Sequence, residues 1–136
     1  MATFPTDAGD LTFRRDMPMF YRCLLTLWGN RLASGLITES IWSDETLESR
    51  LPVVRSAFGH VMNMDPDLLH SLVAARLPVA VDLDEFAKCE VVSLSAYWAD
   101  EALHPVIRLA YGVLDDGVYA LAEVFDGVVT ATELNS

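Results

Sequence analysis

Residues 105–134 read PVIRLAYGVLDDGVYALAEVFDGVVTATEL, and two Asp-Gly pairs, Asp116-Gly117 and Asp126-Gly127, interrupt runs of β-branched and aromatic residues. Asp-Gly favours the type I′ turn of a tight hairpin, because both central residues of that turn have positive φ. The two pairs therefore predict three consecutive antiparallel strands, at about 106–115, 118–125 and 128–134. Residues 89–98 have a similar composition and predict a further strand before them.

The turns also predict which side chains share a face. If each Asp-Gly pair is a two-residue loop, Tyr111 lies opposite Ala122 and Leu109 lies opposite Val124. One face is then apolar and needs a cover; it carries Ile107, Leu109, Tyr111, Val113, Ala120, Ala122, Val124, Val129 and Ala131. The other face is mixed, with Arg108 diagonally across from Glu123.

The preceding part of the chain predicts helices. Residues 17–34 are apolar nearly all round, which is typical of a buried helix, with Asp16 as N-cap and Gly35 as its end. A second helix begins after Ser43 and carries Leu47, Leu51, Val54, Phe58 and Val61 at helical spacing, with Pro52 expected to kink or divide it. A third begins at Asp65-Pro66 and ends at Pro78. Residues 79–84 favour a short strand, and residues 36–42 favour a short strand over the alternative of a helical extension.

The expected fold class is α+β, with about three N-terminal helices packed on one face of a C-terminal antiparallel meander sheet of four or more strands. We expect one domain over residues 1–136, in which 1–16 form a loose lead-in. The helix at 17–34 is expected to cover the apolar sheet face. In layout alone this resembles the NTF2-like cone, and that resemblance implies a pocket between helices and sheet without implying a function.

Composition favours a cytoplasmic protein with an interface. Hydrophobic residues make up 52% of 136 residues, so we expect some apolar surface to be covered by a partner or a second copy, unless small Ala and Val account for the excess. Cys23 and Cys89 are far apart and predict free thiols. The sequence has no run of 18 apolar residues and predicts no transmembrane helix. Arg outnumbers Lys eight to one, which favours a bacterial or phage source.

Charge is concentrated in the second half of the chain. The net charge is −11, and residues 79–136 hold eleven acids against Lys88 and Arg108, a net of −9. This argues against direct binding to nucleic acid or to an anionic membrane, and it favours a basic protein partner. The alternative is that the acids occupy turns and serve solubility.

No motif predicts a chemistry. His60, His70 and His104 have no second ligand at metal-binding spacing. The acidic cluster Asp82, Asp84 and Glu85 lacks the glycine of a calcium loop. The sequence therefore predicts no metal, no cofactor and no catalytic residue.

The leading hypothesis is a small acidic accessory or regulatory protein that acts by protein–protein binding, as an adaptor, inhibitor, immunity-type protein or chaperone does, and that self-associates. The alternative is a small-molecule binder or a lyase- or isomerase-type enzyme with a pocket between helices and sheet. Aromatic and arginine side chains dominate binding interfaces. The candidate contact residues for partner or ligand are Tyr97, Trp98, His104, Arg108, Tyr119, Leu121, Glu123 and Phe125.

Overall fold

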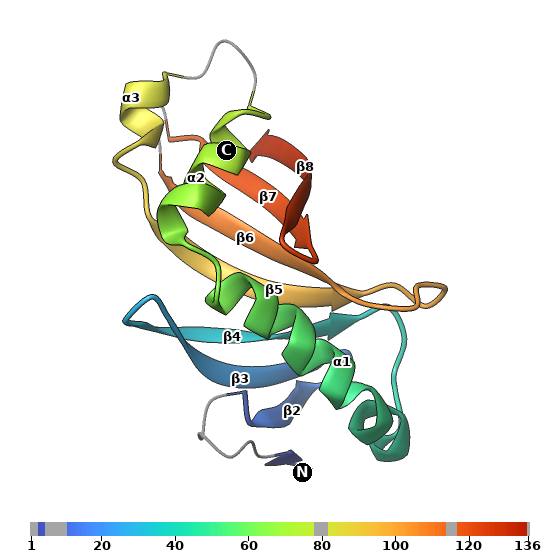
Figure 1. Ribbon diagram of the computed structural model, residues 1–136. Helices are drawn as coiled ribbons and strands as arrows, with labels where there is room; N and C mark the ends of the chain where they lie inside the picture. Colours follow the sequence, from blue (N-terminus) through green and yellow to red (C-terminus); the bar gives the residue numbers. More distant parts are fainter. Residues whose placement is uncertain (1–2, 5–10, 78–81, 114–116, 136) are drawn as a thin grey trace.

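The computed structural model describes residues 3–4, 11–77, 82–113 and 117–135. Within these residues the chain forms one eight-stranded sheet and three helices (Figure 1). The strands lie in the sheet in chain order. The elements are β1 Thr3–Phe4, β2 Phe13–Met17, β3 Phe20–Leu27, β4 Asn30–Thr38, α1 Asp44–Met62, α2 Pro66–Ala74, α3 Leu83–Phe86, β5 Val91–Trp98, β6 Val106–Val113, β7 Tyr119–Phe125 and β8 Val128–Asn135.

The sheet consists of two antiparallel sets joined by one parallel pair. β1 to β4 are antiparallel to one another, as are β5 to β8, whereas β4 and β5 run in the same direction. A parallel pair needs a crossover that brings the chain back to the start of the next strand. The helices lie in this crossover, and α1 and α2 cross one face of the sheet (Figure 1). No helix of the described residues lies over the other face.

The expected arrangement of three N-terminal helices on a C-terminal four-stranded meander is wrong. Residues 17–34 form the end of β2, all of β3, the turns on either side of it and the start of β4. The helices lie between the two strand sets in the chain. Side chains in β3 alternate: Tyr21, Cys23 and Leu25 are buried against the helices, and the residues between them point outward. Leu24 is 49% exposed, so an apolar residue stands where a polar one would have revealed the strand period.

A tight turn at Trp28-Gly29 also argues against the helix. Leu27 pairs with Asn30, and the two residues between them have φ of +49° and +87°. These are the two positive φ values of a type I′ hairpin loop. The predicted strand at 36–42 is present only up to Thr38, as the end of β4.

The helix starts predicted at Ser43 and Asp65 are confirmed. The Ser43 side chain accepts from the Thr46 N–H, and the Asp65 side chain accepts from the Asp67 N–H. Pro52 does not divide α1, which is one helix over 44–62. The predicted strand at 79–84 is wrong where it is described, because Asp82 caps the short helix α3. The third predicted helix was expected to continue to Pro78, but α2 ends at Ala74, with Ala75 as its C-cap. Residues 78–81 lie outside the described residues.

The two C-terminal hairpins are present, with a register shifted by two residues. Leu109 pairs with Ala122, and Tyr111 pairs with Ala120. An even shift leaves the side chains of Ile107–Tyr111 and Ala120–Val124 on their predicted faces. Beyond Tyr111 the register slips again, and Val113, predicted on the apolar face, pairs with Tyr119. Asp126-Gly127 forms the expected two-residue turn, with φ of +51° and +77°. At the first turn residues 114–116 lie outside the described part of the chain.

The prediction that Ala131 of β8 lies on the apolar, helix-covered face is wrong. The β7–β8 register shifts between Glu123 and Val124, as in a β-bulge. A one-residue irregularity exchanges the faces of all residues beyond it. Ala131 therefore lies opposite Glu123 on the uncovered face, and Thr132 lies opposite Ala122 on the helix side.

The core lies between the helices and the covered sheet face. Leu109, Tyr111 and Val124 are buried, as predicted, but the helices that face them are those of the crossover, not one at 17–34. α1 contacts β5 and β6, and α2 contacts β8. Within the described residues, none of the helices combines the length and the apolar character needed to cross a bilayer.

Candidate functional site

The uncovered sheet face brings together most of the predicted contact residues. We call the sheet surface opposite α1 and α2 the open face. The cross-strand pairing of β5 to β8 assigns a set of alternating side chains to it. They are Ser93, Ser95, Tyr97, Arg108, Ala110, Tyr119, Leu121, Glu123, Ala131 and Glu133.

Arg108 is at the centre of this part of the open face. Its guanidinium carbon lies 3.9 Å from the centroid of the Tyr97 ring, which is a cation–π contact. Glu123 lies directly opposite on β7, not diagonally, and its Oε2 is 3.8 Å from Arg108 Nε. Both side chains are partly exposed, so the ion pair contributes little to stability. Together the two contacts hold the arginine in one place on the surface.

Small side chains leave a hollow beside Arg108. Ser93, Ser95 and Ala110 occupy neighbouring strand positions, and with Leu121 and Glu133 they line a depression of about 480 Å³. A depression with small residues and one fixed arginine can receive a side chain from a docked protein.

The remaining predicted contact residues lie elsewhere. His104 is exposed and stacks on Phe125, with ring centroids 3.8 Å apart, at the end of β7. Next to them His60 Nε2 lies 3.6 Å from Asp126 Oδ1. Trp98, also a candidate contact residue for partner or ligand, is 3% exposed and lies on the helix side of β5, away from the open face. The reason is the strand alternation, which sends Tyr97 to the open face and its neighbour into the core.

The other half of the open face is basic, and the sequence did not reveal it. Arg14 pairs with Arg22 across β2 and β3, and Arg31 lies on the same face of β4. Asp16 also belongs to this half, with its Oδ2 2.8 Å from Arg22 Nη2. Exposed Leu24 lies between Arg22 and Thr26 on β3, and exposed Ile37 lies on the same face of β4, opposite Phe20. Expecting a helix at 17–34 hid this surface, although the alternation Arg22, Leu24, Thr26 is the signal for it.

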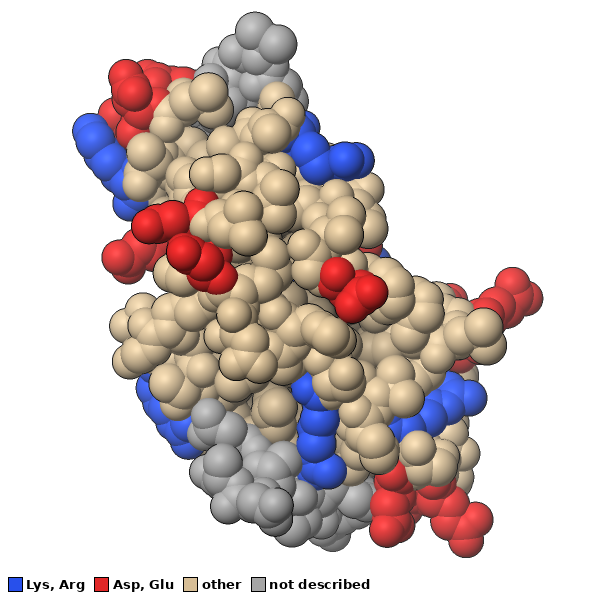
Figure 2. All heavy atoms as spheres, in the orientation of Figure 1, with Lys and Arg blue, Asp and Glu red and all other residues tan. Residues whose placement is uncertain are grey.

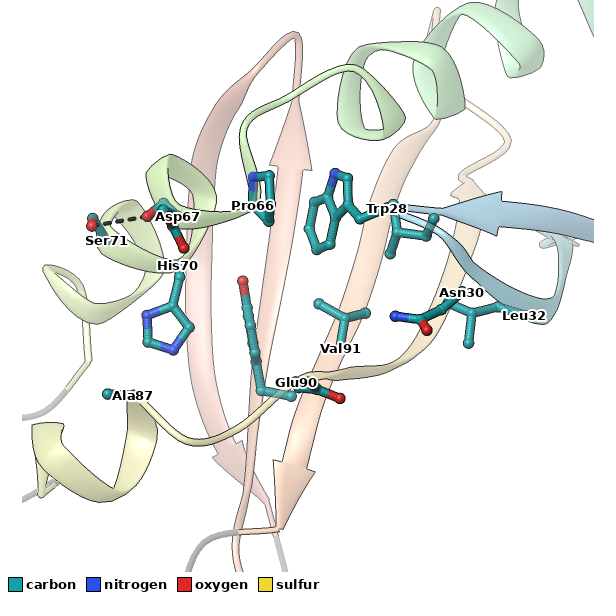
Figure 3. A pocket seen from close by; sticks show the side chains of 12 residues that line it. Trp28, Asn30, Leu32, Pro66, Asp67, His70, Ser71, Ala87, Glu90 and Val91 are labelled. Atoms are coloured by element: carbon teal, nitrogen blue, oxygen red, sulfur yellow. Dashed lines mark hydrogen bonds between the residues drawn. The ribbon is translucent and has the colours of Figure 1, made fainter.

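A second candidate site lies where β4 and β5 separate. Their main chains pair only over Leu36–Thr38 and Ala96–Trp98. Two residues before this paired stretch on each strand, the Ser34 hydroxyl donates a hydrogen bond to the Leu94 carbonyl. Beyond that point the strands diverge and leave a pocket of about 480 Å³, which we call the wedge pocket (Figure 3). It is lined by Leu27, Trp28, Asn30, Leu32, Pro66, Asp67, His70, Ser71, Ala87, Glu90, Val91 and Tyr111.

Tyr111 is the unusual residue of the wedge pocket. It is 2% exposed, and its Oη has no hydrogen-bond partner among the described residues. Burial raises the pKa of Tyr111 above its ordinary value of 10.0. The sequence predicted that this residue is buried, but not that its hydroxyl is left without a partner. A tyrosine on a strand face otherwise made of aliphatic and alanine side chains is the signal that sequence reasoning missed.

His70 is held firmly beside Tyr111. Its Nε2–H donates to the Phe86 carbonyl, at 2.8 Å, and its ring stacks on the Phe86 ring with centroids 4.2 Å apart. The Tyr111 ring meets the His70 ring edge-on at 5.3 Å. These contacts fix one wall of the pocket.

We expect stability to fall above pH 10 in a way that depends on Tyr111. The folded state keeps the phenol protonated to a higher pH than the unfolded chain does, so the unfolded state gains from deprotonation as pH rises through 10.0. The loss is up to about 1.4 kcal/mol per pH unit for one such group. Urea unfolding at pH 8 and pH 11 should show a smaller loss in Tyr111→Phe than in the parent.

Tyr119→Phe is the matched control, because Tyr119 is 39% exposed. Tyr21, whose pKa burial also raises, remains in both variants and keeps part of the alkaline sensitivity. An identical loss in the parent and in Tyr111→Phe would contradict the assignment.

The chain matches no protein-family model, and comparison with curated proteins and with solved structures finds no match either. The assignment of function therefore rests on the geometry of the open face and of the wedge pocket.

Proposed function

We propose that the protein is a small accessory or regulatory protein that acts by binding protein through the open face. The observation that supports this is the gathering of Tyr97, Arg108, Tyr119, Leu121 and Glu123 on one sheet surface without a helix over it. Aromatic and arginine side chains of this kind supply most of the affinity in protein interfaces. An antiparallel sheet with one solvated face usually has polar residues there, and this face has apolar ones among its charges.

The distribution of charge on the open face suits a second copy of the chain. One half carries Arg14, Arg22 and Arg31 with Asp16, and the other carries Glu123 and Glu133 with Arg108. In a two-fold symmetric dimer the same patch of both copies forms the interface, and one half of the patch can contact the other half of the patch on the second copy. A face with a basic half and an acidic half is complementary to itself in that arrangement, and opposite charges across an interface favour association.

The contact would combine the two kinds of residue in different roles. Leu24, Ile37, Tyr119 and Leu121 offer apolar area that a docked copy removes from water. The charged residues fix the orientation and speed the encounter, an effect that weakens as salt rises. We therefore propose a homodimer as the working form.

Complementary charge reversal tests this arrangement. One variant carries Arg14→Glu, Arg22→Glu and Arg31→Glu, and the other carries Glu123→Lys and Glu133→Lys. Each should sediment as a monomer in analytical ultracentrifugation, because like charges then face each other in a homodimer. An equimolar mixture of the two should form a heterodimer, because each basic half again meets an acidic one.

Tyr119→Ala should weaken the parent dimer by about 1–3 kcal/mol with little change in monomer stability. Circular dichroism of every variant checks that the monomer remains folded. A monomeric parent at all concentrations, or a mixture that stays monomeric, would contradict the dimer. A parent that is monomeric but binds an added basic protein, and loses that binding in the Glu123→Lys and Glu133→Lys variant, would replace the second copy by a different partner on the same face.

A further inference from the structure

The wedge pocket offers a binding site on the helix side of the sheet, separate from the open face. Buried polar groups in folded proteins are nearly always hydrogen-bonded, and a buried hydroxyl without a partner costs free energy. Tyr111 Oη is such a group, and Tyr111 lines the pocket. A ligand with a hydrogen-bonding group would supply the partner that the described chain does not.

The charge at the pocket indicates the sign of the ligand. Asp67 and Glu90 line it, and no Lys or Arg is among the described residues that line it. Figure 2 shows acidic side chains gathered around α3 and the start of α2 on this side of the molecule. The N-terminus of α2 does not favour an anion, because Asp65 already caps it through the Asp67 N–H, at 2.8 Å. A cation is therefore favoured over an anion.

The walls suit an organic cation. Trp28, His70 and Tyr111 are aromatic, and aromatic faces attract ammonium groups. The Trp28 indole is held in place, because its Nε1–H donates to the Met64 carbonyl at 3.0 Å. Leu32 and Val91 add aliphatic surface on the side of the diverging strands (Figure 3). A volume of about 480 Å³ is within the range of small-molecule sites.

We propose that the wedge pocket binds a small organic amine, whose ammonium group donates a hydrogen bond to Tyr111 Oη. Asp67 and Glu90 balance the positive charge, and Trp28 and His70 enclose the apolar part of the ligand. The pocket walls come from the β3–β4 hairpin, from α2 and from the start of β5, so binding there does not require the open face.

Three probes that share a phenyl ring and carry a positive, a neutral or a negative head group test the site. 2-Phenylethylamine, 2-phenylethanol and phenylacetate are titrated into the ¹⁵N-labelled full chain and followed by NMR. The amine should perturb the Trp28 indole N–H and the backbone amides of Tyr111 and Val91. It should bind about tenfold or more tightly than the alcohol, because a charge-assisted hydrogen bond is stronger than a neutral one, and phenylacetate should bind most weakly.

Tyr111→Phe removes one oxygen and keeps the ring. It should weaken binding of 2-phenylethylamine by about tenfold, and Tyr119→Phe, the same change on the open face, should leave it unchanged. Asp67→Asn with Glu90→Gln should reduce the preference for the amine over the alcohol. Equal affinity for the three probes, perturbation confined to the open face, unchanged binding in Tyr111→Phe, or no perturbation by any probe would each overturn the proposal. None of these results depends on whether the chain dimerises.

Discussion

Phe58→Ala is expected to lower the free energy of unfolding by about 3–5 kcal/mol. Phe58 is 0% exposed on α1, and its ring centroid lies 6.1 Å from that of Phe13 on β2. α1 also contacts β5 and β6, so this helix packs on strands from both sets. Removing the ring leaves a cavity that the rigid sheet cannot fill, in addition to the lost burial. Urea unfolding followed by tryptophan fluorescence measures the change.

Val53→Ala is the control for that measurement. Val53 lies on the same helix but is 41% exposed, so its truncation should change the stability by less than about 0.5 kcal/mol. Similar losses in the two variants would mean that α1 does not pack on the sheet as described.

Gly35→Ala is expected to cost about 3 kcal/mol through overpacking. A Cβ at Gly35 would lie 2.7 Å from the Tyr21 carbonyl oxygen and would also meet the Phe20 ring. The ring can turn away, but the carbonyl belongs to the backbone of the neighbouring strand. Relief therefore requires β3 and β4 to move apart. Thermal unfolding monitored by circular dichroism should show a clearly lower Tm.

Gly112→Ala provides the matched comparison within the same sheet. The nearest atoms to a Cβ at Gly112 are the Glu90 carbonyl oxygen and Val92 Cγ1, both at 3.6 Å, which is ordinary contact. Alanine restricts the unfolded chain more than glycine does, so this variant should be neutral or slightly stabilised. A Gly35→Ala protein as stable as Gly112→Ala would show that β3 and β4 do not approach each other closely at this point.

Turn and cap residues were the parts of the fold that sequence could predict. Asp126-Gly127 has the positive φ that its dipeptide favours, and Ser43 and Asp65 cap their helices. These signals are local, because the residue itself forms the interaction that defines the turn or cap. The hairpin register was harder to predict from the sequence, because it depends on irregularities such as the shift between Tyr111 and Val113.

The error over residues 17–34 arose from burial, which is not local. β3 needs apolar residues only on its inner face, but Leu24 places one on the outer face as well. Without a polar residue there, periods of two and of 3.6 are hard to distinguish. The Trp28-Gly29 turn was the remaining local signal. Without that turn, the prediction assigned the helix that covers the sheet to residues 17–34. It therefore did not include β2, β3 and β4 in the open face.

The two candidate sites differ in how far the sequence could predict them, because one depends on a local pattern and the other on a contact between distant parts of the chain. The alternation along β6 and β7 placed Arg108, Tyr119, Leu121 and Glu123 together correctly. The wedge pocket depends on where β4 and β5 separate, and these strands are far apart in the sequence. No local pattern near His70 or Tyr111 indicates that separation.

The parallel pairing of β4 with β5 has a consequence for how the chain reaches this fold. Within each set, neighbouring strands are joined by short connections and meet at little entropic cost. The contact between Leu36 and Ala96, in contrast, joins residues 60 positions apart, as does the bond from Ser34 to Leu94. The longest loop closure in the sheet therefore depends on three residue pairs. Burial of α1 against strands of both sets contributes free energy that offsets this cost.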